Sequence, residues 1–128
     1  PISVTAAINS IKIINKNKNK MYAKLERNCE LLTSEIDDLA TDHKIPHQIN
    51  SIASIFQVFF SSKPVTDYKT SKKADGKKFN KLFANLLKNG VFIAPSQFES
   101  VFLSDAHTDA DITKTLGAYG LSLKAVKH

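Results

Sequence analysis

The residue types best suited to chemistry are concentrated in one stretch, Val91–Thr108, with the sequence VFIAPSQFESVFLSDAHT. Two apolar runs within it, Val91–Ala94 and Val101–Leu103, each have the length of a buried strand. The proline between them cannot donate a hydrogen bond to a sheet, so we expect the chain to turn there. This turn presents the Ser96 hydroxyl and the Glu99 carboxylate. Spacing alone leaves two interpretations open: an ordinary strand connection with a solvated glutamate, or a loop that offers a carboxylate to a ligand.

Other reactive side chains have a structural interpretation that is favoured over a functional one. His107 could carry a proton, but a lone histidine more often bonds the corner between a strand and a helix. Cys29 lies among apolar helix positions, which predicts a buried and unreactive thiol, and a single cysteine cannot form an internal disulfide. The remaining histidines, His43, His47 and His128, share no ligand spacing with Asp, Glu or Cys, so we predict no metal site.

The net charge of +6 raises the question of nucleic acid. One basic segment contains Lys63, Lys69, Lys72, Lys73, Lys77, Lys78 and Lys81. Arg27 is the only arginine, although arginine is the residue that best forks onto phosphate and base edges. We therefore predict no nucleic-acid partner, and we keep a small basic α+β nucleic-acid-binding module as an alternative.

Bulk composition indicates one globular domain in a reducing compartment. The 128 residues are 42% hydrophobic and 9% aromatic, which is ordinary for a folded chain with a single core. No apolar run approaches the ~18 residues of a transmembrane helix, and no secretory signal is recognisable. The sequence therefore predicts no membrane partner and a cytoplasmic location. Because Pro1 already stands at a helix start, we expect a piece of a longer protein.

The first elements that must position these groups are helices. Apolar residues at helical spacing predict a first helix with a buried face, formed by Val4, Ala7, Ile8, Ile11 and Ile14. The polar run NKNKN at residues 15–19 predicts a connector. A second helix follows, with an apolar face formed by Tyr22, Leu25, Cys29, Leu32, Ile36 and Leu39 and a solvated face on the other side.

Residues 47–61 are rich in β-branched and aromatic side chains, which predicts two strands or one bent strand. Phe56, Val58 and Phe60 alternate on one face, while Ile55 and Phe59 share the other. Both faces are therefore expected to be partly covered. A polar segment with a helical turn is expected after Pro64.

Two further helices complete the pattern. The stripe Phe79, Leu82, Phe83, Leu86 and Leu87 predicts one of them, and Gly90 is placed to cap it in the left-handed conformation. Thr108 and Asp111 have the spacing of a capping box for the last helix. Its buried face would be Ile112, Leu116, Tyr119, Leu123 and Val126. The elements together predict an α+β fold, a small antiparallel sheet with helices packed on one face.

Several short motifs together resemble one enzyme family. APSQFE at residues 94–99, followed by Ser104, His107 and Thr108, resembles the C-terminal end of class-III pyridoxal-phosphate aminotransferases, and within them an aminomutase branch. PISVTAA at residues 1–7, NSIASIF at residues 50–56 and PVTDY at residues 64–68 are similar to family segments in the same order. These matches cover nearly the whole chain.

The resemblance implies that the chain is the C-terminal small domain of a fold-type-I pyridoxal-phosphate enzyme. Residues 1–19 would be a helix and connector leading from a large domain, and residues 20–128 would be the small domain. The parent enzyme would be a homodimer that uses pyridoxal phosphate or pyridoxamine phosphate. The large domain of the same parent chain would be the partner of this piece.

By the same resemblance, Glu99 faces the substrate, and Ser96 is a weaker substrate-facing candidate. The imine-forming lysine belongs to the large domain, so this chain is expected to hold no catalytic and no cofactor-binding residue and to be inactive alone. The sequence itself agrees with the expected absence of a cofactor site, since the four glycines form no phosphate-binding loop. The family usually has glycine where Ala53 stands, which keeps a sister transaminase with an external amino acceptor as an alternative. A scaffold or dimerisation domain is a third.

Overall fold

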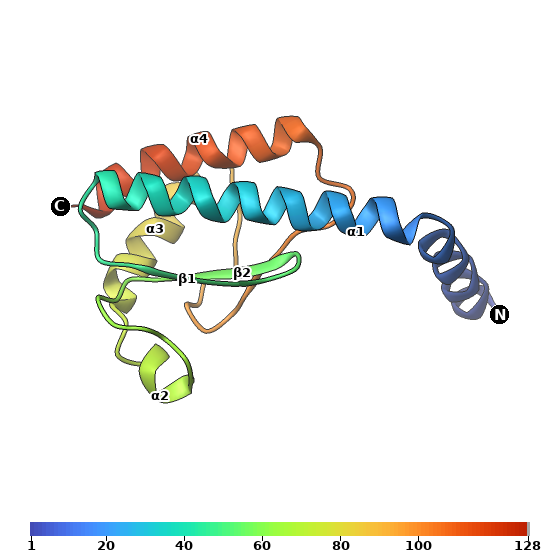
Figure 1. Ribbon diagram of the computed structural model, residues 1–128, viewed down its shortest axis with the longest axis horizontal. Helices are drawn as coiled ribbons and strands as arrows, with labels where there is room; N and C mark the ends of the chain where they lie inside the picture. Colours follow the sequence, from blue (N-terminus) through green and yellow to red (C-terminus); the bar gives the residue numbers. More distant parts are fainter. Residues whose placement is uncertain (128) are drawn as a thin grey trace.

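Three long helices pack against one face of a small antiparallel sheet, which confirms the predicted α+β class (Figure 1). The structure, a computed structural model, describes residues 1–127, so His128 lies outside the described residues. The elements in chain order are α1 (Ile2–Asp42), β1 (Gln48–Ile52), β2 (Ile55–Phe59), α2 (Tyr68–Ser71), α3 (Gly76–Lys88), β3 (Val101–Phe102) and α4 (Asp109–Val126).

The sheet has the strand order β1-β2-β3, and both pairings are antiparallel. Cross-strand partners share a face, so Ile49 and Val58 lie on the helix side while Asn50 and Gln57 lie on the outer side. The predicted alternation is confirmed on both sides. Phe56, Val58 and Phe60 belong to the main core, whereas Phe59 packs with Val65 and Ala74 in a separate buried cluster, on the side away from the long helices.

The hairpin between β1 and β2 turns through only two residues, Ala53 and Ser54. Ala53 has φ +51°, in the left-handed region, while Ser54 does not have a positive φ. A positive φ at the first of two turn residues is the pattern of a type II′ turn, which favours glycine there. This geometry gives a physical reason for the glycine that the resemblance implies at this position.

The main core is closed by side chains of this chain. Leu32 and Ile36 from α1, Leu82 from α3 and Leu123 from α4 are at most 1% exposed. Helix α4 contacts both α1 and α3, and α1 in turn contacts β1 and β2. The predicted buried stripes of α3 and α4 are largely confirmed, with the exception that Leu87 is exposed.

The capping residues predicted from the sequence lie at the helix ends of the structure. Gly90 has φ +77° just beyond α3, as a left-handed cap requires. Thr108 and Asp111 form the predicted capping box at the start of α4. The helical turn expected after Pro64 is α2, and Asp67 caps it through a second box with Thr70.

The predicted break at residues 15–19 is wrong, because α1 runs unbroken from Ile2 to Asp42. Lysine is a good helix former, and asparagine in a helix interior costs only a few tenths of a kcal/mol, roughly. Asn17 also donates its side-chain Nδ2 to the Ile13 carbonyl at 3.1 Å, one turn back. Polarity therefore marks a solvated stretch of helix here, and Figure 1 shows that α1 bends in its N-terminal part but does not end.

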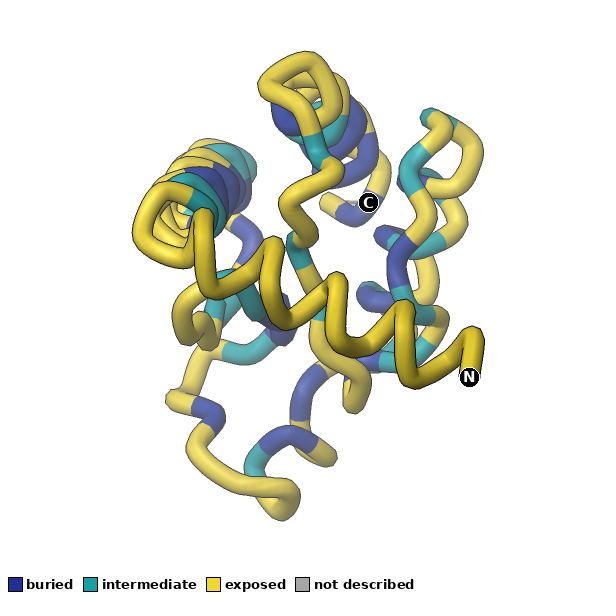
Figure 2. Tube along the Cα trace, turned by 90° about the vertical axis from the view of Figure 1, so that its right-hand side faces the viewer, coloured by how far each residue is buried: buried dark blue, intermediate teal, exposed yellow. Residues whose placement is uncertain are grey.

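The first predicted buried face is also wrong for the described chain. Every residue from Pro1 to Lys20 is exposed, including Val4 at 62% and Ile11 at 58%. Figure 2 shows this N-terminal part of α1 as a continuous exposed stretch. The apolar stripe exists in the sequence, but no other element among residues 1–127 covers it.

Val91–Ala94 is not a strand, and the second predicted strand is only Val101–Phe102. The amide of Val91 donates to the Leu86 carbonyl at 2.9 Å, so it completes the end of α3 and is unavailable to a sheet. Ile93 is nevertheless buried, which explains the apolar run. The sheet is therefore smaller than the sequence predicted.

Candidate functional site

The loop from Pro95 to Ser100 is held against the outer face of the sheet by the backbone and side chain of Gln97. The Gln57 side chain on β2 donates Nε2–H to the Gln97 carbonyl at 2.9 Å. Gln97 in turn points Nε2 at the Ser71 carbonyl of α2, at 3.5 Å. Gln57 and Gln97 are buried, so water does not compete for these contacts. The loop conformation is thus tied to both β2 and α2.

The two predicted substrate-facing residues lie in this loop. The Ser96 hydroxyl accepts a hydrogen bond from the Phe98 amide at 3.2 Å, and the Ser96 carbonyl accepts one from the Glu99 amide at 3.1 Å. Ser96 therefore closes the turn that carries Glu99. Glu99 itself is exposed, and within residues 1–127 its carboxylate forms no ion pair. Its orientation toward a substrate stays a prediction.

Two shallow cavities of about 260 Å³ each flank the Phe98 ring. Asn50, Phe59 and Phe98 line both of them. Ser96 lies beside a third and larger cavity of about 550 Å³, next to Gln97. Glu99 lines none of the three. The loop thus brings Ser96 to one of these three cavities and Glu99 to none of them.

An exposed aromatic pair forms one wall beside the loop. The Tyr68 and Phe98 rings are 5.8 Å apart at an interplanar angle of 52°, and Lys72 Nζ lies 5.4 Å from the centre of the Tyr68 ring. Tyr68 and Phe98 are 68% and 52% exposed, which is high for large rings. An exposed aromatic wall with a nearby cation suits contact with another part of a protein or with a planar ligand.

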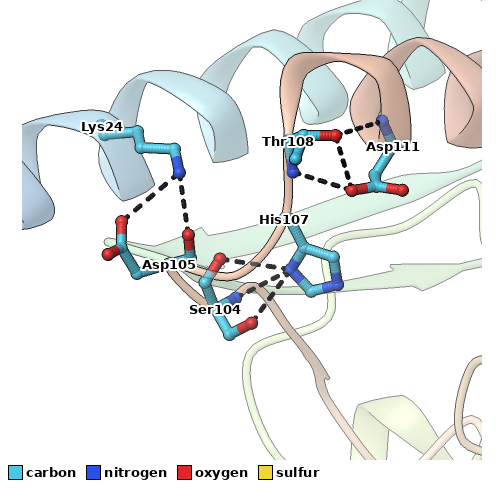
Figure 3. A network of polar contacts seen from close by, with 6 residues as sticks. All are labelled: Lys24, Ser104, Asp105, His107, Thr108 and Asp111. Atoms are coloured by element: carbon cyan, nitrogen blue, oxygen red, sulfur yellow. Dashed lines mark hydrogen bonds and ion pairs between the residues drawn. The ribbon is translucent and has the colours of Figure 1, made fainter.

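The corner between β3 and α4 carries a polar network (Figure 3). The Ser104 amide donates to His107 Nδ1 at 3.0 Å. Nδ1 also lies 3.3 Å from the Ser104 hydroxyl and 3.2 Å from the Ser104 carbonyl. His107 is therefore a structural residue of the corner, as the sequence favoured. Lys24 of α1 donates to the Asp105 carbonyl at 2.9 Å and ties this corner to the first helix.

Carboxylates at two helix starts are stabilised in their charged form. Backbone and side-chain hydrogen bonds from Thr108 lower the pKa of Asp111, and those from Thr70 lower the pKa of Asp67. On α1, burial raises the pKa of the Cys29 thiol, with a smaller contribution from Glu30. A thiol with a raised pKa is a poor nucleophile, which agrees with the inert role predicted from the sequence.

A covalent site for pyridoxal phosphate, the cofactor that the resemblance implies, needs a lysine amino group held in an enclosed pocket. Every lysine among residues 1–127 is exposed except Lys24 and Lys78, which are half-buried. Lys24 is engaged with Asp105, and Lys78 does not line the cavities described above. The described residues do not fit such a cofactor by themselves, and we derive no chemical step through one. In the same part of the chain, no group of three potential metal ligands comes together.

Sequence reasoning missed the two glutamines that fasten the loop. Gln57 stands in the otherwise apolar strand IFQVF, and a polar residue between buried apolar neighbours is the signal that could have identified it. Asn50, which faces Gln57 across the hairpin, donates to the Val65 carbonyl at 2.8 Å. The outer face of the sheet is thus organised by side-chain amides rather than by charge.

Comparison with solved structures defines the class of protein. The chain is similar to an omega-transaminase from Sphaerobacter thermophilus, with a TM-score of 0.73 and 15% identity over 90% of this chain and 26% of that one. It is also similar to the FumI protein of Sphingopyxis sp. MTA144 in its PLP internal aldimine form, with a TM-score of 0.73 and 27% identity over 94% of this chain and 26% of that one. The fold is therefore that of one part of a pyridoxal-phosphate transaminase.

Curated relatives are more specific. The chain is 67% identical over 128 residues to glutamate-1-semialdehyde 2,1-aminomutase of Nitrosopumilus maritimus (strain SCM1). It is 50% identical over 127 residues to glutamate-1-semialdehyde 2,1-aminomutase 1 of Cenarchaeum symbiosum (strain A). No protein-family profile matches. The predicted resemblance is confirmed: along its whole length, the chain matches a part of glutamate-1-semialdehyde 2,1-aminomutase, and it spans about 30% of the length of these relatives.

Within residues 1–127, no helix combines the length and the apolar character that crossing a bilayer requires.

Proposed function

We propose that this chain acts within a longer polypeptide as the small-domain part of a glutamate-1-semialdehyde 2,1-aminomutase. Such an enzyme moves an amino group within glutamate-1-semialdehyde and gives 5-aminolevulinate for tetrapyrrole biosynthesis. The observation that carries the proposal is the 67% identity to the Nitrosopumilus maritimus relative along the whole chain. The parent is proposed to be a cytoplasmic homodimer, with residues 1–19 leading from its large domain and residues 20–128 forming the small domain.

The proposed cofactor is pyridoxal phosphate, alternating with pyridoxamine phosphate, which carries the amino nitrogen when it is bound. Its binding residues are assigned to the part of the parent that lies outside this chain. The contribution of this chain is a carboxylate on a fixed loop. Glu99 is proposed to accept hydrogen bonds from a substrate ammonium group, an interaction that is stronger than a bond between neutral partners. Ser96 supports it by closing the turn.

The proposal is tested with a chimera in which this chain replaces the matching 30% of the Nitrosopumilus maritimus relative. We expect the chimera to convert glutamate-1-semialdehyde to 5-aminolevulinate without any added keto acid. The 128-residue chain alone should show no aldimine absorbance after addition of pyridoxal phosphate. A borohydride-stable lysine adduct at one site of the isolated chain would contradict the assignment.

The role of Glu99 is tested in the same chimera. We expect Glu99→Gln to lower kcat/KM at least about tenfold, because a hydrogen bond to a charged group contributes roughly 1.5–3 kcal/mol. Glu26→Gln, on the exposed side of α1, is the matched control and should leave turnover unchanged. Equal activity of both variants would remove Glu99 from the substrate site.

A second candidate function is supported by the likeness to an omega-transaminase. A transaminase needs an external amino acceptor, whereas an aminomutase returns the nitrogen to the same carbon skeleton. Turnover of the chimera that depends on an added keto acid would favour the transaminase. The basic segment leaves a nucleic-acid module to be tested as well, and such binding should weaken steeply with salt.

A further inference from the structure

The side chain of Gln97 is buried without being fully hydrogen-bonded. Gln97 is 8% exposed, and its Oε1 has no hydrogen-bond partner among residues 1–127. A buried amide oxygen without a donor lowers the stability of a fold, because it loses its hydrogen bonds to water and gains none in return. An apolar side chain of the same length would avoid this loss. Stability therefore does not explain why a glutamine stands at this position.

The nitrogen of the same amide makes only a weak contact. Gln97 Nε2 lies 3.5 Å from the Ser71 carbonyl oxygen, which is long for a hydrogen bond. That carbonyl already accepts a hydrogen bond from the Ala74 amide at 3.1 Å, so it would keep a donor if Gln97 were replaced. Turning the amide over would place oxygen against oxygen at Ser71, so the orientation of the amide is fixed. The contact at Ser71 therefore defines a direction but adds little stability.

Three elements of the fold fix the position of Gln97. Its backbone carbonyl accepts a hydrogen bond from Gln57 Nε2 on β2 at 2.9 Å, and its side chain reaches Ser71 at the end of α2. At the start of α3, a Cβ added to Gly76 would lie 3.6 to 3.8 Å from the Gln97 amide, so the amide passes close to the backbone of this helix. The backbone and the side chain of one residue are thereby held at the same time, which sets the direction of the chain through the turn.

The two predicted substrate-facing residues lie on either side of Gln97. Ser96 precedes it directly, and Glu99 follows two positions later, with its amide bonded to the Ser96 carbonyl at 3.1 Å. A hydrogen bond has a preferred direction, whereas apolar contact is non-directional. A side-chain amide at position 97 therefore restricts the orientation of this turn more closely than an apolar side chain of the same size would.

We propose that Gln97 is a positioning residue for the proposed reaction: its side-chain amide orients the turn that carries Ser96 and Glu99, and it lowers the stability of the fold in doing so. The inference rests on the proposed function, because it takes Glu99 to be the group that contacts the substrate. Gln57 has a different role. Loss of its side chain would leave the Gln97 carbonyl without this donor, so Gln57 stabilises the loop, whereas the Gln97 side chain orients it.

The test uses Gln97→Met in the chimera described above, with Gln48→Met as the matched control. Methionine is similar to glutamine in length and volume but lacks both polar atoms of the amide. We expect Gln97→Met to leave the unfolding midpoint of the chimera unchanged or to raise it, because the unpaired Oε1 is removed. The same variant should lower kcat/KM by about threefold to tenfold, because a small misplacement of a group that contacts the substrate lowers the rate. Gln48→Met should leave turnover unchanged.

A double-mutant cycle with Glu99→Gln separates positioning from a general effect on the fold. If Gln97 acts through Glu99, Gln97→Met should lower kcat/KM by less than about twofold when Glu99→Gln is already present. A residue that only supports the fold would lower the activity of both backgrounds by the same factor, and such additivity would overturn the inference. A Gln97→Met chimera that fails to fold, or that is less stable than the Gln48→Met chimera, would also overturn it.

Failure of this inference can be told apart from failure of the proposed function. Full activity of the Gln97→Met chimera would overturn the inference and leave the proposed function standing. An unsubstituted chimera that does not convert glutamate-1-semialdehyde would refute the proposed function, and amide exchange in the 128-residue chain then decides the role of Gln97. Gln97→Met should accelerate exchange of the Phe98 and Glu99 amides without lowering the unfolding midpoint. Unchanged exchange at both amides would show that Gln97 does not orient the turn.

Discussion

Replacing Gln57 with methionine tests whether the loop that carries Ser96 and Glu99 is held in place by one buried hydrogen bond. Gln57 Nε2 donates to the Gln97 carbonyl at 2.9 Å, and the two glutamines are 6% and 8% exposed. Methionine has a similar length and volume, so the packing is largely kept while the donor is removed.

The expected magnitude follows from the acceptor that is left behind. A buried carbonyl without a partner costs about 1–3 kcal/mol, and part of this cost is offset because a buried side-chain amide has been replaced by an apolar group. We therefore expect Gln57→Met to lower the free energy of unfolding by about 1–2 kcal/mol. Gln48→Met is the matched control. Gln48 donates only to the adjacent His47 carbonyl in a half-buried setting, so its loss should cost under about 0.5 kcal/mol.

The assay is urea unfolding of the 128-residue chain followed by far-UV circular dichroism, combined with amide exchange in the loop. The Phe98 and Glu99 amides donate within the loop, so their exchange should accelerate in Gln57→Met and not in Gln48→Met. A loss of stability no larger than that of the control, with unchanged exchange at both amides, would show that the loop does not depend on this hydrogen bond.

Three further changes test other features. Ala53→Gly should raise the free energy of unfolding, measured in urea, by about 0.5–1 kcal/mol. A left-handed alanine costs roughly 1–2 kcal/mol, and the larger conformational entropy of glycine in the unfolded chain cancels part of that gain. A loss of stability would contradict the turn geometry. The pKa of Asp111 is lowered in the folded state, so its stabilising effect is complete above an unfolded pKa of about 3.9 and disappears as pH falls through the lower folded value. The difference in stability between the unsubstituted 128-residue chain and its Asp111→Asn variant should accordingly shrink as the pH falls below about 4. A difference that stays constant with pH would count against the lowered pKa of Asp111. Cys29 is 2% exposed and burial raises the pKa of its thiol, so a disulfide reagent should label it only when the chain opens. Immediate labelling of the native chain would show that the thiol is accessible.

Features that depend on a few neighbouring residues could be predicted from the sequence. The stripe and left-handed cap of α3, the capping box of α4 and the alternation of Phe56, Val58 and Phe60 were each confirmed. Apolar spacing fixes which side of an element can be buried, and caps fix where a helix ends. The APSQFE motif and its ordered companions similarly identified the relatives, because the match needs residue types in order and no knowledge of contacts.

Features that depend on a partner distant in the sequence were decided only by the tertiary structure. Val91–Ala94 had the composition of a strand, but the Val91 amide is used at the end of α3. The stripe of Val4 and Ile11 is helical as predicted, but it is exposed, because no element among residues 1–127 covers it. The Gln57–Gln97 hydrogen bond joins positions forty residues apart, so no local sequence pattern predicts that these two residues are partners. The sequence by itself determined which faces of the elements are apolar and which residues can cap a helix. Only the tertiary structure determined which of those faces are buried and which polar groups are paired, because burial and hydrogen bonding are properties of pairs of groups rather than of single residues.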